Sequence, residues 1–263
     1  MCKVAVITGG SSGIGLCTAK ILSDSGCRVY EISRHDCSIP GITHITGDVT
    51  DNSSLENAVN KIVEKENKID ILINNAGFGI SGACEFTDIS SVKRILDVNL
   101  LGMIRMTNLV LPHMRKCKSG KIINLSSVAA CIPIPFQAFY SVSKAAVNSY
   151  TMALANEVKP FGITVTAVMP GDTCTSFTSS RQKCPDGDDI YGGRISRSVS
   201  TMEKDEKNGA DPVYAGKFIA KIALKNKKKP LYTIGFSYKF VIFLYKILPC
   251  KILNKLIGLI YAK

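Results

Sequence analysis

The sequence lacks the cysteine arrangements that mark disulfide-rich and metal-binding proteins. Ten cysteines occur among 263 residues, but none form a CxxC pair or a Cys/His cluster at the spacing of metal ligands. A secretory signal peptide is not evident either, since "MCKVAVITGG" runs directly into an apolar, strand-like stretch. We therefore expect reduced thiols, a cytoplasmic protein and no metal site.

Acidic residues and arginine are absent from the stretch between Lys217 and Lys263, which contains eleven lysines. These lysines account for almost all of the net charge of +12. They are interleaved with long apolar stretches rather than with polar or stacking residues. This pattern argues against nucleic-acid binding.

The same tail also lacks an apolar run long enough to cross a membrane. Its lysines divide the apolar residues into runs well short of the ~18 that a spanning helix needs. An amphipathic helical stripe begins at Ile252, with Lys251 and Lys255 on the opposite side. Residues 236–263 therefore predict a basic tail that either attaches to the inner face of a membrane or packs on the domain as a lid or dimer contact.

Short β-branched runs alternate with helical patterns along most of the chain, and the 46% hydrophobic content is ample for a core. This alternation is typical of βαβ units, so we expect one α/β domain over residues 1–263: a doubly wound, Rossmann-type parallel sheet with helices on both faces. The expected strands lie within residues 3–9, 27–33, 43–49, 70–77, 120–127, 163–171 and 230–235.

The periodicity is lost between residues 172 and 211, where Gly, Ser, Pro and charged residues dominate. A segment of this length inside a compact domain is uncommon unless it is functional, so we expect a substrate lid there. The stretch "DPVYAGKFIAKIAL" then predicts a helix, with Asp211 as its N-cap and Pro212 at the first helical position.

The segment "VAVITGGSSGIG" reads as a strand, a glycine-rich turn and the start of a helix. Glycines at positions 9, 13 and 15 would let the backbone approach a pyrophosphate and direct helix N–H groups at it. The spacing Gly-x3-Gly-x-Gly differs from GxGxxG, and a plain tight turn would use the same residue type.

The end of the second strand is where a dinucleotide-binding enzyme distinguishes NADP from NAD. Ser33 and Arg34 fall there, and an arginine accommodates a 2′-phosphate, so we expect NADP(H) in preference to NAD(H). A solvated surface arginine is the alternative. Glu31 and Asp36 are near enough to leave the register open.

Tyr140 and Lys144 in "YSVSK" are spaced to share one face of a helix. A nearby ammonium would bring the tyrosine pKa from ~10 toward neutrality and make the phenol a proton donor and acceptor. By itself this spacing also occurs on ordinary exposed helix faces.

In combination, the motifs of the first 175 residues resemble the classical short-chain dehydrogenase/reductase family. They occur in the family's order: "TGGSSGIG", "GDVTD", "NNAG", "DVNLLG", "NLSS", "YSVSK" and "PG". The resemblance implies the catalytic residues Asn99, Ser127, Tyr140 and Lys144. Ser126 competes for the serine role, but the family's usual interval to the tyrosine selects Ser127.

The resemblance also implies a set of cofactor-binding positions. They are Gly9, Ser11, Ser12, Gly13, Ile14 and Gly15 at the pyrophosphate, Ser33 and Arg34 at the 2′-phosphate, Asp48 and Val49 at the adenine, Asn75, Ala76 and Gly77 at the ribose, and Tyr140, Lys144, Pro170, Gly171, Thr173 and Thr175 at the nicotinamide side. Thr173 stands where the family often has an aliphatic residue, which puts the contacts there in doubt.

The resemblance implies that Tyr140 protonates the oxygen of a carbonyl that receives hydride, while Ser127 orients that oxygen. Lys144 would lower the Tyr140 pKa and hold the nicotinamide ribose, and Asn99 would position a water behind Lys144. The same resemblance implies a homodimer or homotetramer.

A looser resemblance, to the hydroxysteroid and retinol dehydrogenase-like branch, concerns the substrate. The apolar stretches "CIPIPFQAF" and "GFGISG" would suit a steroid or another bulky lipophilic substrate, although an ordinary core is equally apolar. The alternatives are reduction of a small or long-chain aliphatic carbonyl, an epimerase or dehydratase with a tightly held cofactor, and a non-catalytic NADP(H)-binding sensor.

Overall fold

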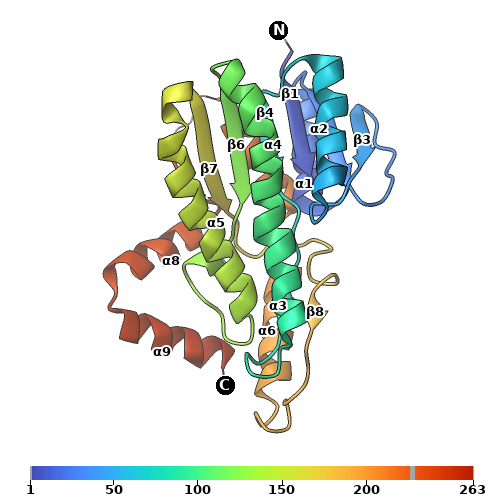
Figure 1. Cartoon of the computed structure of the whole chain (residues 1–263). Coiled ribbons are helices and arrows are strands. Elements are labelled where there is room, and N and C mark those ends of the chain that lie inside the picture. Colours follow the sequence, from blue (N-terminus) through green and yellow to red (C-terminus); the bar gives the residue numbers. More distant parts are fainter. Residues whose placement is uncertain (1, 226–228, 263) are drawn as a thin grey trace.

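The computed structural model describes residues 2–225 and 229–262. Seven parallel strands form one sheet in the order β3-β2-β1-β4-β6-β7-β9 (Figure 1). The strands are β1 (Val4–Thr8), β2 (Arg28–Ser33), β3 (Ile42–Thr46), β4 (Ile71–Asn74), β6 (Gly120–Leu125), β7 (Ile163–Met169) and β9 (Leu231–Thr233). The doubly wound parallel sheet expected from the alternating runs is confirmed. Strand order reverses between β1 and β4, which is where such sheets open a crevice for ligands.

Helices cover both faces of this sheet (Figure 1). One face is covered by α1 (Gly13–Asp24) and α7 (Pro212–Leu224), and the other by α2 (Asn52–Glu66), α4 (Gly102–Lys116) and α5 (Ala138–Glu157). All five residues of β1 are buried, and successive side chains point to opposite faces. Val4 and Val6 therefore belong to one apolar cluster, and Ala5 and Ile7 to the other.

The helix predicted after Asp211 is confirmed as α7. The Asp211 carboxylate accepts a hydrogen bond from Val213 N at 2.7 Å, and Pro212 occupies the first helical position, where no backbone N–H is needed. This helix packs against α1 so closely that a Cβ on Gly216 would lie 2.9 Å from the Cys17 Cβ.

The longest helical run combines α3 (Ile89–Leu96), a π-helical turn at Asp97–Leu101 and α4. By length and composition alone, residues Ile89–Lys116 could cross a membrane. This weak signal is equally that of a core helix, and α4 packs on β4 and β6 with Met106 and Val110 fully buried. A single π turn within an α-helix is often found at a functional site.

The segment at residues 172–211 is more regular than we expected. It contains β8 (Gln182–Lys183), which pairs with β5 (Ile80–Ser81), and the helix α6 (Arg194–Lys207). The buried residues of α6 are Ile195, Ser198, Met202 and Glu206. Two of these four are polar, which explains why the sequence showed no apolar helical period.

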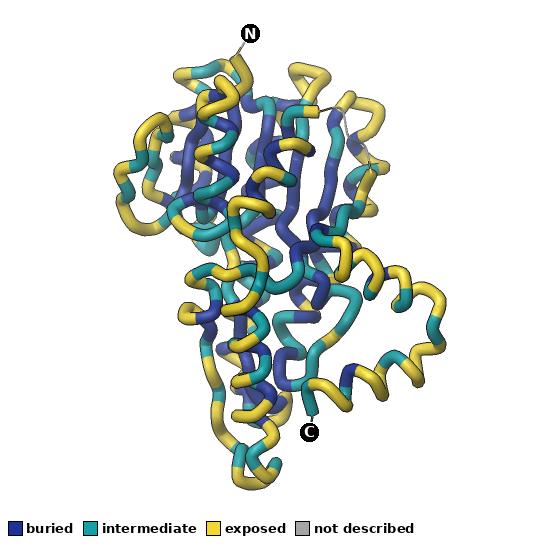
Figure 2. The backbone as a smooth tube through the Cα atoms, turned by 180° about the vertical axis from the view of Figure 1, so that it is seen from behind, coloured by how far each residue is buried: buried dark blue, intermediate teal, exposed yellow. Residues whose placement is uncertain are grey.

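The basic tail forms two helices, α8 (Phe236–Ile247) and α9 (Cys250–Tyr261). The predicted helical stripe from Ile252 lies within α9. Both helices extend away from the sheet at its carboxyl edge, and most of their residues are exposed (Figures 1 and 2). The chain end returns to α6, where the Arg194 guanidinium donates to Ala262 O at 2.6 and 2.9 Å. The short helical turns Val128–Ala130 and Lys159–Phe161 complete the fold.

Candidate active site

A cavity of about 1400 Å³ is lined by residues at the carboxyl ends of the central strands and by residues of α6, α8 and α9. Its wall combines polar strand ends with apolar residues from the C-terminal helices. The cavity therefore has one side suited to a polar cofactor and another suited to an apolar substrate.

The glycine-rich turn after β1 forms the first part of the polar wall. Gly9 and Gly13 have φ angles of +64° and +53°, which residues with a side chain rarely adopt. Because α1 begins at Gly13, its unpaired N–H groups lie at the cavity, as a dinucleotide phosphate requires. The predicted residues that line the cavity here are Gly9, Ser11, Ser12, Gly13 and Ile14.

Gly15 does not line the cavity, so its predicted place on the pyrophosphate wall is not observed. A Cβ on Gly15 would lie only 2.4 Å from both the Asn75 Nδ2 and the Gly9 carbonyl oxygen. Gly15 thus permits close packing behind the turn rather than forming part of its surface.

The register at the end of β2 is now clear. Ser33 and Arg34 line the cavity, as do Asp48 and Val49, whereas Glu31 points away from it. Burial alone would raise the pKa of Asp48, but hydrogen bonds from Thr50 and the charge of Arg34 lower it. Asp48 therefore stays ionised beside the Arg34 guanidinium.

Asn75, Ala76 and Gly77 follow β4 and line the cavity next to the glycine turn. Asn75 Nδ2 donates to Gly9 O at 2.7 Å and to Thr8 O at 3.1 Å. Ala76 N donates to Thr8 Oγ1 at 3.2 Å. Asn75 therefore holds the end of β4 and the glycine turn of β1 in one arrangement.

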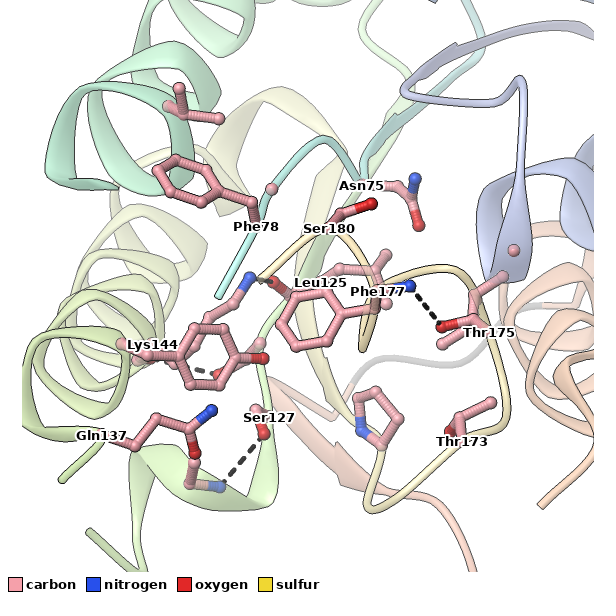
Figure 3. Close-up of a pocket in the computed structure, with 18 of the residues that line it drawn as sticks. Asn75, Phe78, Leu125, Ser127, Gln137, Lys144, Thr173, Thr175, Phe177 and Ser180 are labelled. Atoms are coloured by element: carbon pink, nitrogen blue, oxygen red, sulfur yellow. Dashed lines mark hydrogen bonds between the residues drawn. The ribbon is translucent and has the colours of Figure 1, made fainter. Parts of the chain in front are cut away.

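Ser127, in the turn after β6, and Tyr140 and Lys144, both on α5, all line the cavity. Figure 3 shows Ser127 and Lys144 there. Lys144 Nζ lies 5.7 Å from the Tyr140 ring centroid. The Lys144 ammonium donates to Leu125 O at 2.8 Å. Ser126 Oγ instead donates to Lys144 O at 3.1 Å, so its hydroxyl is already engaged by the backbone.

The pKa values at this site differ from the expected ones. Burial raises the pKa of Tyr140 to about 12, and the neighbouring Ser127 hydroxyl acts in the opposite direction. Burial also lowers the pKa of Lys144 to about 8. The expected lowering of the tyrosine pKa by Lys144 is not found, because burial disfavours both the phenolate and the ammonium. The phenol is thus held in its proton-donating form.

Asn99 is buried in the π-helical turn and does not line the cavity. Its Nδ2 donates to Phe78 O at 3.0 Å and to Ser143 Oγ at 3.2 Å, while its Oδ1 accepts from Phe78 N at 3.0 Å. The side-chain amide is therefore occupied by protein groups, and it fixes the backbone after Gly77.

All four predicted residues after β7, Pro170, Gly171, Thr173 and Thr175, line the cavity. Thr173 Oγ1 donates to Gly171 O at 3.0 Å, so the hydroxyl that stands in place of an aliphatic side chain forms a hydrogen bond within the turn. Thr175 Oγ1 accepts from Phe177 N at 3.2 Å (Figure 3). A Cβ added to Gly13 would lie 3.4 Å from Thr175, so this loop packs over the glycine turn.

Several cavity residues carried no recognisable sequence signal. The Tyr238 hydroxyl donates to Asp172 Oδ2 at 2.6 Å and accepts from Asp172 N at 3.0 Å. The Phe177 ring lies 5.5 Å from the Tyr140 ring, and Glu206 pairs with Arg181. The tail also lines the cavity, although only its apolar character was evident from the sequence. Its lining residues are Val241, Leu244, Leu248, Leu253, Leu256, Ile257 and Ile260.

Comparison with known proteins identifies the family. The sequence profile of the short chain dehydrogenases matches residues 3–185. The chain belongs to this family. A similar protein is the 3-ketodihydrosphingosine reductase of Bacteroides thetaiotaomicron, 42% identical over 234 residues, which are 88% of this chain and 87% of the relative. The predicted family membership is thus confirmed, and the protein is an oxidoreductase.

Solved structures of short-chain dehydrogenases share the fold. One from Streptomyces avermitilis has a TM-score of 0.84 at 25% identity and covers 92% of this chain and 91% of its own. ElxO with NADP bound has a TM-score of 0.76 at 27% identity, and the match covers 91% of this chain and 100% of ElxO. The 3-ketoacyl-(acyl-carrier-protein) reductase from Brucella melitensis, complexed with NADH, has a TM-score of 0.75 at 25% identity. The match covers 88% of this chain and 96% of that reductase. These neighbours support a nicotinamide cofactor of either kind.

Proposed function

We propose that this chain is an NADP(H)-dependent reductase that converts a long-chain lipophilic ketone into a secondary alcohol. The observation that carries the proposal is the cavity, because Tyr140 and Ser127 line the same cavity as the apolar residues of α8 and α9. The relative from Bacteroides thetaiotaomicron, named for a long-chain keto substrate, favours a keto lipid over the steroid that we first expected. The proposed products differ from their ketones by a hydride and a proton.

The proposed chemistry divides between the cofactor and the chain. A bound nicotinamide would supply hydride to the carbonyl carbon. Tyr140 would donate its phenolic proton to the oxygen, and Ser127 would hydrogen-bond the same oxygen and orient it. The raised Tyr140 pKa, about 12, suits this direction, because it keeps the proton on the phenol until negative charge develops on the substrate.

Lys144 and Asn99 would act through position rather than through contact with the substrate carbonyl. Lys144 Nζ donates to Leu125 O, and Lys144 lines the cavity, where it could reach a cofactor ribose. We assign Asn99 to holding the Phe78 backbone and with it the turn at Gly77.

The NADP(H) preference rests on Arg34 at the end of β2. Its guanidinium is exposed at the cavity, whereas the Glu31 carboxylate, which could have received ribose hydroxyls, is buried and accepts a hydrogen bond from Gly10 N. Arg34 would therefore face the 2′-phosphate without a competing carboxylate from Glu31.

Asp172 gives the proposed pocket a means to recognise a cationic headgroup. It lines the cavity, its carboxylate is half-buried, and its hydrogen-bonding partner is the Tyr238 hydroxyl. Among residues 2–225 and 229–262, no lysine or arginine forms an ion pair with Asp172. A 3-ketosphingoid base carries an ammonium group beside its ketone, which would match this carboxylate when the ketone lies at Tyr140.

The exposed side of α8 and α9 would place the enzyme at its lipid source. Phe236, Phe240, Phe243 and Ile247 are between 55% and 86% exposed. The lysines of these helices, at positions 239, 246, 251 and 255, are also exposed. Apolar and basic side chains together fit an anionic membrane surface. The cytoplasmic location and an assembly of two or four copies remain predictions.

The proposal can be tested by following NADPH oxidation with four ketones: 3-ketodihydrosphingosine, a ketone of equal chain length without the amine, a steroid ketone and a short aliphatic ketone. We expect turnover of the long-chain ketones. In Asp172→Asn, KM for the amino ketone should rise by at least roughly tenfold, while that of the amine-free ketone stays the same. Asp186→Asn, an exposed loop position, is the matched control.

Equal losses for both long-chain ketones would show that Asp172 acts through its contact with Tyr238 and would remove the headgroup assignment. NADPH binding without turnover of any ketone would contradict the reductase and favour the sensor. Turnover of the steroid alone would replace the keto-lipid substrate.

A further inference from the structure

Three metal-ligating side chains meet beside the glycine turn, outside the cavity. The His44 Nδ1 and Glu31 Oε2 atoms are 2.6 Å apart, Cys37 Sγ lies 3.3 Å from the same carboxylate oxygen, and Cys37 Sγ lies 3.6 Å from His44 Nδ1. Glu31 is fully buried, His44 is 10% exposed in its side chain, and Cys37 is partly buried. This cluster could not be predicted from the sequence, because its spacing matches no common metal motif.

The fold brings these residues together from two strands and the loop between them. Glu31 and His44 are directly paired on the adjacent strands β2 and β3, so their side chains share one face. Cys37 lies in the connecting segment, which turns back through an Ile39–Ile42 bridge with Ile42 N donating to Ile39 O at 3.1 Å. Two of the three groups are thus held by rigid strands, as a metal site needs.

Thiolate, imidazole and carboxylate together form a ligand set that zinc prefers. Zinc bonds of ~2.0–2.3 Å in tetrahedral geometry place ligand atoms roughly 3.3–3.7 Å apart. The two separations that involve Cys37 already fall there. The Glu31–His44 pair would open by less than about 1 Å when an ion replaces its hydrogen bond.

The surroundings orient His44 for such a role. Its second ring nitrogen, Nε2, lies 3.1 Å from Thr46 Oγ1. A hydrogen bond donated by Nε2 would direct the unprotonated Nδ1 toward Glu31 and Cys37, as the outer partners of metal-binding histidines commonly do. The exposed Asp36 carboxylate also lies near this ring, with Oδ1 4.0 Å from Nε2.

We propose that Glu31, Cys37 and His44 bind one zinc ion, with water as the exchangeable fourth ligand. On binding, the Cys37 thiol would release its proton to solvent, since the thiolate is the ligand.

The site would brace the cofactor turn. The other carboxylate oxygen of Glu31, Oε1, accepts a hydrogen bond from Gly10 N at 3.0 Å. A Cβ on Gly10 would lie 2.6 Å from Glu31 Cγ, so the turn packs directly on this side chain. An ion on Oε2 would fix the carboxylate that holds the turn, and metal occupancy would raise the thermal stability of this edge of the sheet.

The test is a titration of the metal-stripped full chain with Co²⁺, which reports thiolate ligation by a sulfur-to-cobalt charge-transfer absorption, followed by displacement with Zn²⁺. We expect one cobalt per chain, a charge-transfer band that zinc abolishes, and a zinc-dependent rise in Tm. Cys37→Ser should remove the band, and His44→Gln should weaken cobalt binding by at least roughly tenfold.

Cys117→Ser changes an exposed cysteine far along the chain and is the matched control; its band should equal that of the unmodified protein. Circular dichroism of Cys37→Ser would establish that the variant folds. A chain without the band would overturn the proposal, as would a band that survives Cys37→Ser, since that would place the cobalt on other thiols.

Discussion

The two regions of the cavity are built differently. Residues 4–170 supply the strand ends and α5, where polar side chains are fixed by backbone partners, such as Lys144 on Leu125 O and Asn75 on Gly9 O. Residues 171–262 supply α6, α8 and α9. There Ile242 and Ile257 are the buried residues of α8 and α9, and most other side chains of these two helices are exposed.

This difference fits the two tasks of the proposed reductase. Hydride and proton transfer require groups held within fractions of an ångström, which a parallel sheet buried on both faces provides. Substrate selection requires an apolar wall whose shape can vary, which weakly packed helices provide. Variants in the first region should therefore change turnover or cofactor choice, and variants in the second should change substrate affinity.

The largest effect is expected for Tyr140→Phe, which removes the proposed proton donor from the first region. Turnover should fall by roughly 10²- to 10⁴-fold, while NADPH affinity, measured by nicotinamide fluorescence, stays within about twofold. Tyr214→Phe, on the exposed side of α7, should behave as the unmodified protein. Retained turnover in Tyr140→Phe would contradict the proposed mechanism.

Arg34→Asp should change cofactor choice without changing the substrate. Loss of a charged hydrogen bond to the 2′-phosphate, with a carboxylate in its place, should lower kcat/KM for NADPH by roughly 10- to 100-fold and leave that for NADH equal or higher. Steady-state kinetics with both cofactors would measure this. Lys20→Asp on α1 makes the same change in charge, and an equal loss in it would mean that overall charge, not Arg34, decides the preference.

The C-terminal region should respond to paired substitution of Phe240 and Phe243 by serine. Both are 55% exposed, so the fold should tolerate the change, while binding to anionic vesicles should weaken at least roughly tenfold. Cosedimentation with vesicles measures this, and turnover of a long-chain ketone in the absence of vesicles should not change. Ile190→Ser, at a residue 71% exposed in the loop before α6, is the control. Undiminished vesicle binding in the paired variant would remove the membrane role of α8.

The smallest effect concerns stability and pH. Lys144 has an ordinary pKa of 10.5, which burial lowers to about 8 in the folded chain. Between these values Lys144 binds more protons in the unfolded chain, so its contribution to the free energy of unfolding should rise as the pH increases from about 8 toward 10. Lys144→Met should reduce this rise by about 1–3 kcal/mol in urea titrations at each pH. Lys121, whose pKa burial also lowers to about 8, should contribute in the same direction. An unchanged slope in Lys144→Met would mean that Lys144 keeps its proton in the folded chain.

Much of the first region could be predicted from the sequence, because its signals are local. The β-branched runs predicted the strands. Gly9 and Gly13 predicted a tight turn, and both have the positive φ angles that such a turn requires. The i, i+4 spacing of Tyr140 and Lys144 placed them on one helix face, since helix geometry fixes that relation regardless of the rest of the fold.

Other features depended on contacts between residues distant in sequence. The amide of Asn99 is occupied by Phe78 and Ser143, the ring of Tyr238 covers Gly171, and Glu31 faces Gly10 and His44 rather than the cavity. The Tyr140 pKa likewise follows from burial, which no spacing reveals. The sequence by itself thus determined the doubly wound sheet and the order of its polar strand ends, because strand and turn preferences act over a few residues. Only the tertiary structure decided which side chains face the cavity, which are consumed by the protein's own hydrogen bonds and which remain exposed, because these depend on the packing of distant segments.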